Sequence, residues 1–176
     1  NEDVYLSVYC YESEDFDNCL LEGDFYLDID DAKDPSTALT EARAVVEIFR
    51  KLNVPDGLIS IYWSGAKGFH FEIPIEAFNG VPHRDLNRIW KTFAQMINEH
   101  RDLAHVDWSI FDRRRLWRIV NSRNSKTGLY KIPLPVNELM TLSIEEIKKL
   151  AKEPRQLPER PTPKPLENLE RLWKEL

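Results

Sequence analysis

The sequence predicts an α+β fold, in which strands and helices are mixed along the chain. Residues 25–30 and 69–73 alternate apolar and polar side chains as strands do. Residues 35–52 and 82–97 repeat apolar residues at helical spacing. A further strand-like stretch, 58–63, lies so close to 69–73 that the two are expected to form a hairpin. The hairpin argues against a regular series of strand, helix and parallel strand.

Length and composition indicate one domain with an appendage. The chain has 176 residues, of which 42% are hydrophobic, so it can bury a sizeable core. Residues 1–152 are expected to form the main domain, and residues 153–176 a proline-rich linker and an amphipathic helix. The first residue is Asn1 rather than Met, so we expect the native protein to be longer.

The sequence contains neither an apolar run long enough to span a membrane nor an export signal, so no membrane association is expected. Two cysteines, Cys10 and Cys19, make neither a disulfide framework nor a zinc cluster. Their scarcity favours a reduced, cytoplasmic setting, with a Cys10–Cys19 disulfide as the alternative.

Charge is distributed unevenly along the chain. The net charge is −6, but residues 1–34 carry −11 and residues 101–131 carry +5. An acidic and a basic segment in one domain fit a site with metal on one wall and phosphates on the other. They also fit a soluble protein with internal ion pairs.

The first part of the chain is expected to supply two strands and a helix. Val4–Tyr11 is rich in Val and Tyr and is expected to form a strand, as is the stretch 25–30. Asp34-Pro35 is a typical helix start, because Asp caps the free backbone N–H groups and Pro suits the first helical position. This helix is expected to end at about Leu52.

The strand at 25–30 places two carboxylates on one face. Side chains alternate between the faces of a strand, so Phe25 and Ile29 are expected to face the core with Leu27. Asp28 and Asp30 then share the opposite face and repel each other unless a cation lies between them. Carboxylate oxygens suit hard divalent ions such as Mg²⁺ or Mn²⁺. The alternative is a solvated strand end.

The hairpin turn contains the second informative stretch, Ser64-Gly-Ala-Lys-Gly-Phe-His70. Its glycines, Gly65 and Gly68, allow the backbone to approach a ligand closely, and exposed N–H groups in such a turn favour anions. A hydroxyl, the Lys67 charge and His70 add to what reads as a phosphate cradle. The alternative is an ordinary hairpin loop with a surface lysine and a hydrogen-bonded histidine.

A basic segment follows the second helix. Trp117–Asn121 and Leu129–Leu134 are expected to be paired strands around the polar loop Ser122–Gly128. Arg binds phosphate in a bidentate manner and Lys as a point charge, so the segment suits a triphosphate or a nucleic-acid backbone. The alternative is a solvated basic rim that pairs with the acidic N-terminal region.

The C-terminal part begins with Ser143-Ile-Glu-Glu146, a capping box that opens a helix to about Lys152. The proline-rich stretch Pro154–Pro165 is expected to be a stiff, extended linker. Apolar residues from Leu166 to Leu176 then predict a last amphipathic helix, which either packs back on the domain or docks a partner.

These stretches resemble, in their order and intervals, the motifs of the archaeo-eukaryotic primase superfamily. Phe25–Asp30 looks like its first motif, and Ser64–His70 is similar to its second, a Ser-x-His with glycines. Val106-Asp107 looks like the third motif, and Arg118–Gly128 resembles the segment that follows it in primase small subunits. The resemblance covers residues 24–134, most of the domain.

The resemblance implies two interleaved α/β units, one with a sheet like that of an RNA-recognition motif, and an active site in the cleft between them. It implies that three acids are catalytic and hold two Mg²⁺ or Mn²⁺ ions: Asp28, Asp30 and Asp107. Nucleotide contacts are expected from Ser64, Gly65, Lys67, Gly68, His70, Arg118, Ser122, Asn124 and Lys126. Nucleic-acid contacts are expected from Arg113, Arg114, Arg115 and Arg123, with salt bridges as the alternative for the first three.

Two features depart from the common family pattern. Asn124 stands where many primases carry His, so that contact is expected to be weaker or made differently. The zinc-binding insertion of cellular primases has no counterpart, so no zinc is expected. The chain therefore resembles the compact primase-polymerase branch of plasmids, phages and mobile elements, which implies a prokaryotic cytoplasm.

The function expected from the residues and the resemblance is template-dependent nucleotidyl transfer, as a primase and DNA polymerase. Its partners would be single-stranded DNA template and primer, dNTP or NTP, and replication proteins or further domains of a longer chain. One alternative is an end-joining or gap-filling repair polymerase of the same superfamily. Others are a catalytically silent nucleic-acid-binding module and a metal-dependent nuclease.

Overall fold

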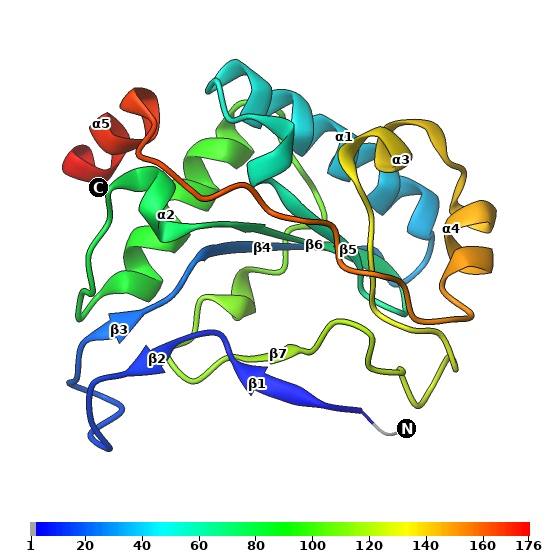
Figure 1. Ribbon diagram of the computed structural model, residues 1–176, viewed down its shortest axis with the longest axis horizontal. Helices are drawn as coiled ribbons and strands as arrows, with labels where there is room; N and C mark the ends of the chain where they lie inside the picture. Colours follow the sequence, from blue (N-terminus) through cyan, green and yellow to red (C-terminus); the bar gives the residue numbers. More distant parts are fainter. Residues whose placement is uncertain (1–2) are drawn as a thin grey trace.

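The structure is a computed structural model that describes residues 3–176; Asn1 and Glu2 of the acidic N-terminal segment lie outside the described residues. Its middle layer is a four-stranded antiparallel sheet in the order β4–β6–β5–β8 (Figure 1). The strands are β4 (Phe25–Asp30), β5 (Ser60–Trp63), β6 (Gly68–Ile73) and β8 (Ile132–Pro133). The expected hairpin is confirmed as β5 and β6.

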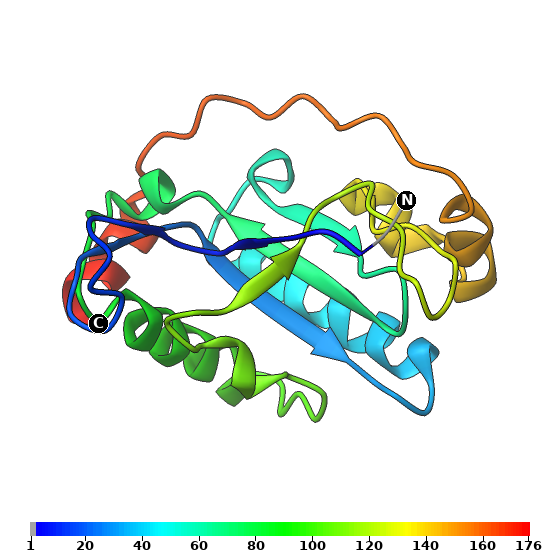
Figure 2. The same ribbon diagram turned by 90° about the horizontal axis from the view of Figure 1, so that it is seen from below.

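Helix α1 (Pro35–Lys51) covers one face of this sheet (Figures 1 and 2). The expected cap is confirmed, since the side chain of Asp34 accepts a hydrogen bond from the backbone N–H of Ser36 at 2.9 Å and Pro35 opens the helix. Helix α2 (Leu86–Glu99) packs at the Phe25 end of β4, where the Trp90 and Phe93 rings contact the Phe25 ring.

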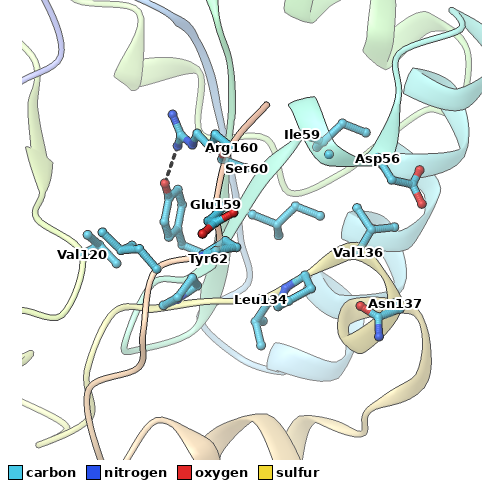
Figure 3. A pocket seen from close by; sticks show the side chains of 16 residues that line it. Asp56, Ile59, Ser60, Tyr62, Val120, Leu134, Val136, Asn137, Glu159 and Arg160 are labelled. Atoms are coloured by element: carbon cyan, nitrogen blue, oxygen red, sulfur yellow. Dashed lines mark hydrogen bonds between the residues drawn. The ribbon is translucent and has the colours of Figure 1, made fainter. Parts of the chain in front are cut away.

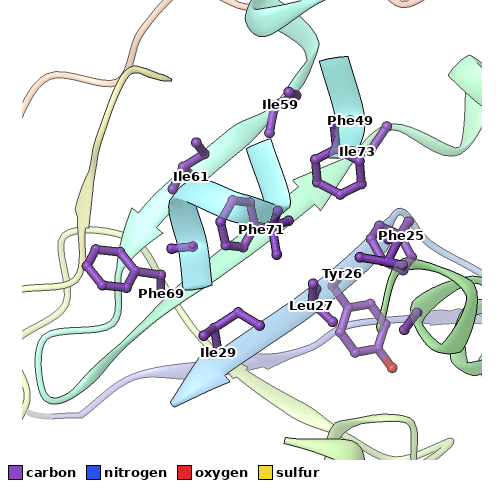
Figure 4. Packing of buried hydrophobic residues seen from close by; sticks show 14 of the residues in the cluster. Phe25, Tyr26, Leu27, Ile29, Phe49, Ile59, Ile61, Phe69, Phe71 and Ile73 are labelled. Carbon is purple, nitrogen blue, oxygen red and sulfur yellow. The ribbon is translucent and has the colours of Figure 1, made fainter. Parts of the chain in front are cut away.

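The main core lies between the sheet and these helices. Phe25, Leu27 and Ile29 of β4 are fully buried there, as the alternation predicts. Phe69, Phe71 and Ile73 of β6 share this face, and Figure 4 shows them against α1. Edge-to-face packing of Phe49 on Phe71, with ring centroids 6.2 Å apart, joins α1 to the sheet.

The opposite face of the sheet is covered as well. A two-stranded ribbon of β1 (Tyr5–Ser7) and β7 (Leu116–Arg118) lies over it, as Figure 2 shows from that side. Tyr26 is therefore buried, and its hydroxyl bonds to that of Tyr9 at 2.7 Å. The polar residues of β4 and β6 thus lie between two layers rather than in open solvent.

Two expected strands are corrected by the pairing. Trp117–Asn121 and Leu129–Leu134 do not form a paired hairpin, because β7 pairs with β1 and β8 pairs with β5. The two segments are connected instead by backbone hydrogen bonds of Lys131 with Asn121 and Ser122 and by an isolated bridge between Arg123 and Tyr130. Each strand pairs with the free edge of another strand, and sequence periodicity does not show which edge that is.

The expected strand Val4–Tyr11 is split into β1 and β2 (Cys10–Tyr11), and β2 pairs with β3 (Leu21–Glu22). The chain bends where Tyr9 turns inward to its buried hydroxyl partner. Both cysteines are free, Cys10 exposed and Cys19 buried, so the alternative disulfide is not formed.

The remaining helices lie at the sheet edge and the C-terminus. They are α3 (Val136–Thr141), α4 (Ile144–Leu150) and α5 (Glu167–Glu175), with short 3₁₀ turns at Asp56–Leu58, Ile75–Phe78 and Trp108–Ile110. The capping box at Ser143 and Glu146 is confirmed. Helix α5 packs back on the domain, with Leu169 fully buried and the ring of Trp173 5.5 Å from that of Trp90. Within residues 3–176, no helix is both long and apolar enough to cross a bilayer.

Asp24, which precedes β4, links the sheet to the turn at Ile75. Its Oδ1 accepts a hydrogen bond from the backbone N–H of Ile75 at 3.2 Å. Burial raises the pKa of Asp24 from 3.8 to about 6, and the nearby Glu72 and Glu76 add to the rise.

We expect Asp24→Asn to stabilise the protein near neutral pH by on the order of 2 kcal/mol. Between pH 3.8 and about 6 the folded protein binds the Asp24 proton more tightly than the unfolded chain does, so wild-type stability falls as the pH rises through this window. Above this pH window, Asp24 is ionised in both states and the full loss of stability is present. Denaturant unfolding should show the gain at about pH 7.5 and little gain at about pH 4. Glu99→Gln, on an exposed residue, is the control for loss of one negative charge.

Candidate active site

A cleft of about 240 Å³ lies between the central sheet and the β1–β7 ribbon. Its lining residues are Tyr5, Asp28, Asp30, Ser64, Ala66, Lys67, His70, Arg115, Leu116, Trp117, Arg118 and Asn124. Three other hollows are larger, of about 530, 550 and 580 Å³, but neither Asp28 nor Asp30 lines any of them. We place the candidate active site in the smaller cleft, because the acidic pair, the glycine-rich turn and the basic segment meet there.

Asp28 is the deepest acid of the cleft. It lies opposite His70 in the β4–β6 register and is 6% exposed. Its Oδ1 is buried without a hydrogen-bond partner among the described residues, and lies 3.8 Å from His70 Nε2. Burial, followed by the nearby carboxylates of Asp30 and Asp107, raises the pKa of Asp28 to about 8. The site thus holds an acid whose charge is not compensated by neighbouring donors.

Asp30 lies at the end of β4, opposite Gly68 of β6. Its Oδ2 is 2.7 Å from Lys67 Nζ, so the lysine of the glycine-rich turn neutralises the outer acid. A Cβ at Gly68 would lie 2.2 Å from the carbonyl oxygen of Ile29, which only glycine avoids. Gly68 therefore allows the close approach that brings Lys67 to Asp30.

The turn between β5 and β6 is closed by Ser64. Its Oγ accepts hydrogen bonds from the backbone N–H groups of Gly68 at 3.2 Å and Ala66 at 3.4 Å. These N–H groups point at the serine, which leaves the hydroxyl hydrogen of Ser64 to be donated into the cleft. Gly65 takes a φ of +85°, which a side chain would strain.

Asp107 reaches the acidic pair through the backbone. Its N–H donates to the carbonyl oxygen of Asp28 at 3.0 Å. Its Oδ1 accepts from the Ser109 hydroxyl at 2.6 Å, and its Oδ2 lies 3.4 Å from the Arg115 guanidinium. In the part of the chain that the structure describes, no three acidic, histidine or cysteine side chains form a group that could hold a metal ion. Asp28 and Asp30 line the cleft, and Asp107 lies beside them in the backbone.

The chemistry of the acidic pair fits a divalent cation. The oxygen donors are hard, Asp28 Oδ1 lacks a partner within residues 3–176, and Lys67 is the cation now beside Asp30. Asp28 and Asp30 would hold such an ion, whereas the carboxylate of Asp107, the expected third ligand, is held by Ser109 and Arg115 and does not line the cleft.

His70 is held by an aromatic neighbour from the β1–β7 ribbon. Trp117 of β7 lies on the imidazole, with ring centroids 4.0 Å apart and planes inclined by 31°. Burial, followed by the charges of Lys131, Arg118 and Arg115, lowers the pKa of His70 well below 6.5. The neutral ring can donate one hydrogen bond toward an anion. The only sequence signal for Trp117 is its position next to Arg118.

The basic residues divide between the cleft and the surface. Arg118 lines the cleft, where its guanidinium pairs with Asp3 and donates to the Tyr5 hydroxyl at 2.6 Å. Arg115 also lines the cleft, and its Nε is buried without a partner among residues 3–176. The structure thus brings Arg115 to the acids rather than to an outer nucleic-acid surface.

Arg113 is not brought to the cleft. Its guanidinium donates to the carbonyl oxygens of Phe16 and Cys19, each at 2.9 Å, and to that of Arg84. Arg114 is exposed and pairs with Asp17 at 2.9 Å. The salt-bridge alternative thus describes Arg114, and also Arg115 with its pair to Asp107, whereas Arg113 holds the loop before β3.

The loop at 122–128 contributes Asn124 to the cleft. Its Oδ1 accepts from the backbone N–H groups of Lys126 at 3.0 Å and Thr127 at 3.2 Å, which leaves the amide hydrogens for other acceptors. Ser122 is buried, and its hydroxyl donates to the carbonyl oxygen of Ile119 at 2.6 Å. Arg123 and Lys126 are exposed outside the cleft lining.

Comparison with known proteins shows similarity at the level of fold. The chain is similar to the polymerase domain of Ligase D from Mycobacterium tuberculosis, a structure in complex with DNA, with a TM-score of 0.56 and 18% sequence identity. The match covers 84% of this chain and 58% of that chain. No family model and no curated protein matches the sequence. The comparison therefore shows a shared fold, a mixed α/β arrangement with small antiparallel sheets.

We expect Asp28→Asn to increase the free energy of unfolding by roughly 1–3 kcal/mol in the absence of divalent cations, and so to raise the melting temperature. The substitution removes a buried carboxylate whose Oδ1 lacks a partner within residues 3–176. Mg²⁺ or Mn²⁺ should stabilise the wild type but not this variant. Thermal melts with and without the ions measure both effects.

Asp30→Asn is the matched comparison, because it deprives Lys67 of its partner and should give no such gain. A lower melting temperature for Asp28→Asn than for the wild type would contradict this account of the site.

Proposed function

We propose that the chain is a template-dependent nucleotidyltransferase that adds nucleotides to a 3′-hydroxyl. The observation that carries the proposal is the meeting of the acidic pair, the glycine-rich turn and the basic segment in one cleft. These segments come from β4, the β5–β6 turn and β7, which are far apart in the sequence. The fold match to a polymerase domain supports this assignment.

The cleft supplies groups of opposite charge at short range, as a bound nucleoside triphosphate with its cations requires. Asp28 and Asp30 would hold Mg²⁺ or Mn²⁺, which when bound supply a more acidic 3′-hydroxyl and neutralise phosphate charge. Ser64 and the neutral His70 would donate hydrogen bonds to phosphate oxygens, and Arg118 and Arg115 would add charge. Positioning by these groups accounts for most of the effect.

The partially buried cleft favours this chemistry over a solvated surface. Asp28 and His70 are both less than one-tenth exposed, so the interactions that they make with a bound ligand are weakly screened by water. Lys67 pairs with Asp30 in the structure, and its ammonium would move to a phosphate oxygen once a cation takes its place beside Asp30. A template strand would be bound outside the cleft, where Arg123 and Lys126 are exposed.

A gap-filling or end-joining repair polymerase is the second candidate. The observation that favours it is the fold match to a Ligase D polymerase domain. This version would extend primers but would not start chains, and it would recognise a 5′-phosphate across a gap. A primase would use single-stranded DNA without a primer.

We expect Asp28→Ala and Asp30→Ala each to reduce nucleotide incorporation by about a thousandfold, because each removes a carboxylate that would hold the divalent cation at the reacting phosphates. A gel assay with labelled dNTP, primed template and Mn²⁺ or Mg²⁺ measures the rate, and a chelator should abolish it. Asp56→Asn is the control, because Asp56 forms only an exposed ion pair with Arg50. Undiminished synthesis by both alanine variants would rule out the proposed site.

We expect products on primed DNA, with the highest rate on a gapped duplex that carries a 5′-phosphate if the repair version holds. Products on unprimed single strands would instead establish a primase. Shortened products would identify a nuclease, and nucleic-acid binding without any product or nucleotide binding would identify a silent module.

A further inference from the structure

Residues 154–166 form an extended segment, here named the C-terminal strap. It connects α4 to α5 and arches across the edge of the sheet, as the orange segment of Figure 2 shows. Most of its residues are exposed. The strap therefore gains little from burial and depends on individual polar contacts.

A hollow of about 530 Å³ lies between the strap and the sheet edge. Figure 3 shows it, with Leu134 and Val136 on one side and Arg160 of the strap on another. Two arginines of the strap bind the domain through their side chains. Arg155 forms a bidentate pair with Glu138 at 2.6 and 2.9 Å, and Arg160 reaches β5 and β6.

Arg160 contacts the face of the sheet that carries the candidate active site. Its guanidinium donates to the Tyr62 hydroxyl at 2.6 Å and to Glu72 Oε2 at 3.1 Å. Glu72 lies two residues after His70 on β6, so both side chains point to the same face. Tyr62 of β5 lies directly opposite His70 in the register.

The second oxygen of Glu72 holds the residue that lies on His70. Oε1 accepts a hydrogen bond from Trp117 Nε1 at 2.9 Å. Trp117 in turn lies against the imidazole, with ring centroids 4.0 Å apart. Arg160, Glu72, Trp117 and His70 therefore form an unbroken series of contacts from the strap to the cleft.

Buried Lys131 competes for the same carboxylate. Its Nζ lies 3.9 Å from Glu72 Oε1, too far for a hydrogen bond, and donates to the carbonyl oxygen of Arg118 at 2.9 Å. It also lies over the rings of Tyr62 and Trp117, at 4.6 and 5.0 Å from their centroids. Without Arg160, Glu72 would be drawn toward this ammonium and away from the indole N–H.

We propose that Arg160 and Glu72 are positioning residues for the nucleotide site, and that the strap fixes the His70 ring through Trp117. The proposal rests on the proposed function for its effect on nucleotides, but not for the contacts themselves. Neither residue lines the cleft. The strap thus acts on the site indirectly, because Arg160 holds the Glu72 carboxylate in the position where it accepts the Trp117 N–H.

The test compares strap variants of the full chain. We expect Arg160→Ala and Glu72→Gln to shift the His70 ring resonances in NMR spectra, because the ring current of Trp117 moves relative to the imidazole. Both should weaken binding of dGTP in the presence of Mg²⁺ by about tenfold, the scale on which supporting partners act on the groups they orient. In the extension assay the KM for dGTP should rise more than kcat falls, and Arg160→Lys should restore part of the loss.

Arg155→Ala is the matched control, because it removes the other arginine anchor of the strap without touching Glu72 or Trp117. It should leave the His70 resonances and dGTP affinity unchanged. Combining Arg160→Ala with Trp117→Phe should cost no more affinity than Trp117→Phe alone, because the phenyl ring lacks the N–H that Glu72 accepts.

Unmoved His70 resonances in Arg160→Ala would overturn the proposal, as would equal shifts in Arg155→Ala, which would show general loosening of the strap. If the wild type binds no dGTP, the proposed function fails, and the His70 resonances alone then decide whether the strap positions the ring.

Discussion

The structure depends on a buried polar face between two layers of strands. In β4, strict alternation sends Phe25, Leu27 and Ile29 into the main core and commits Asp28 to the opposite face. That face is covered by the β1–β7 ribbon, so the Asp28 carboxylate is removed from water at a cost in free energy. The core on the first face is large and well packed, and it offsets the cost on the second.

Local sequence signals were sufficient for much of the fold. Asp34 with Pro35, and Ser143 with Glu146, specify helix starts through contacts within one turn, and both are found. The hairpin of β5 and β6 was equally local. The strand partners of β7 and β8 were not, because an alternating pattern shows that a strand exists but not which exposed sheet edge it completes. Residues 5–7 and 116–118 pair across more than a hundred positions.

Part of the candidate site could also be predicted from the sequence. Alternation placed Asp28 on the face of β4 opposite the core, and the register sets it opposite His70 of β6. The basic segment was harder to interpret, because consecutive arginines in a turn point in different directions. Arg113 is consumed by carbonyl oxygens, whereas Arg115 reaches the acids. Trp117 supports His70 from another layer, a relation that no spacing in the chain encodes.

The contact between Asp3 and Arg118 has a consequence for ligand recognition. The Asp3 carboxylate is held by Ser125 and Arg118, whose hydrogen bonds lower its pKa to about 2. It occupies the guanidinium much as a phosphate oxygen would. On the proposed function, a phosphate that binds Arg118 would have to displace this carboxylate. The affinity measured for a phosphate ligand would then include this exchange. Two proteins with the same cleft but different N-terminal segments would differ in apparent affinity.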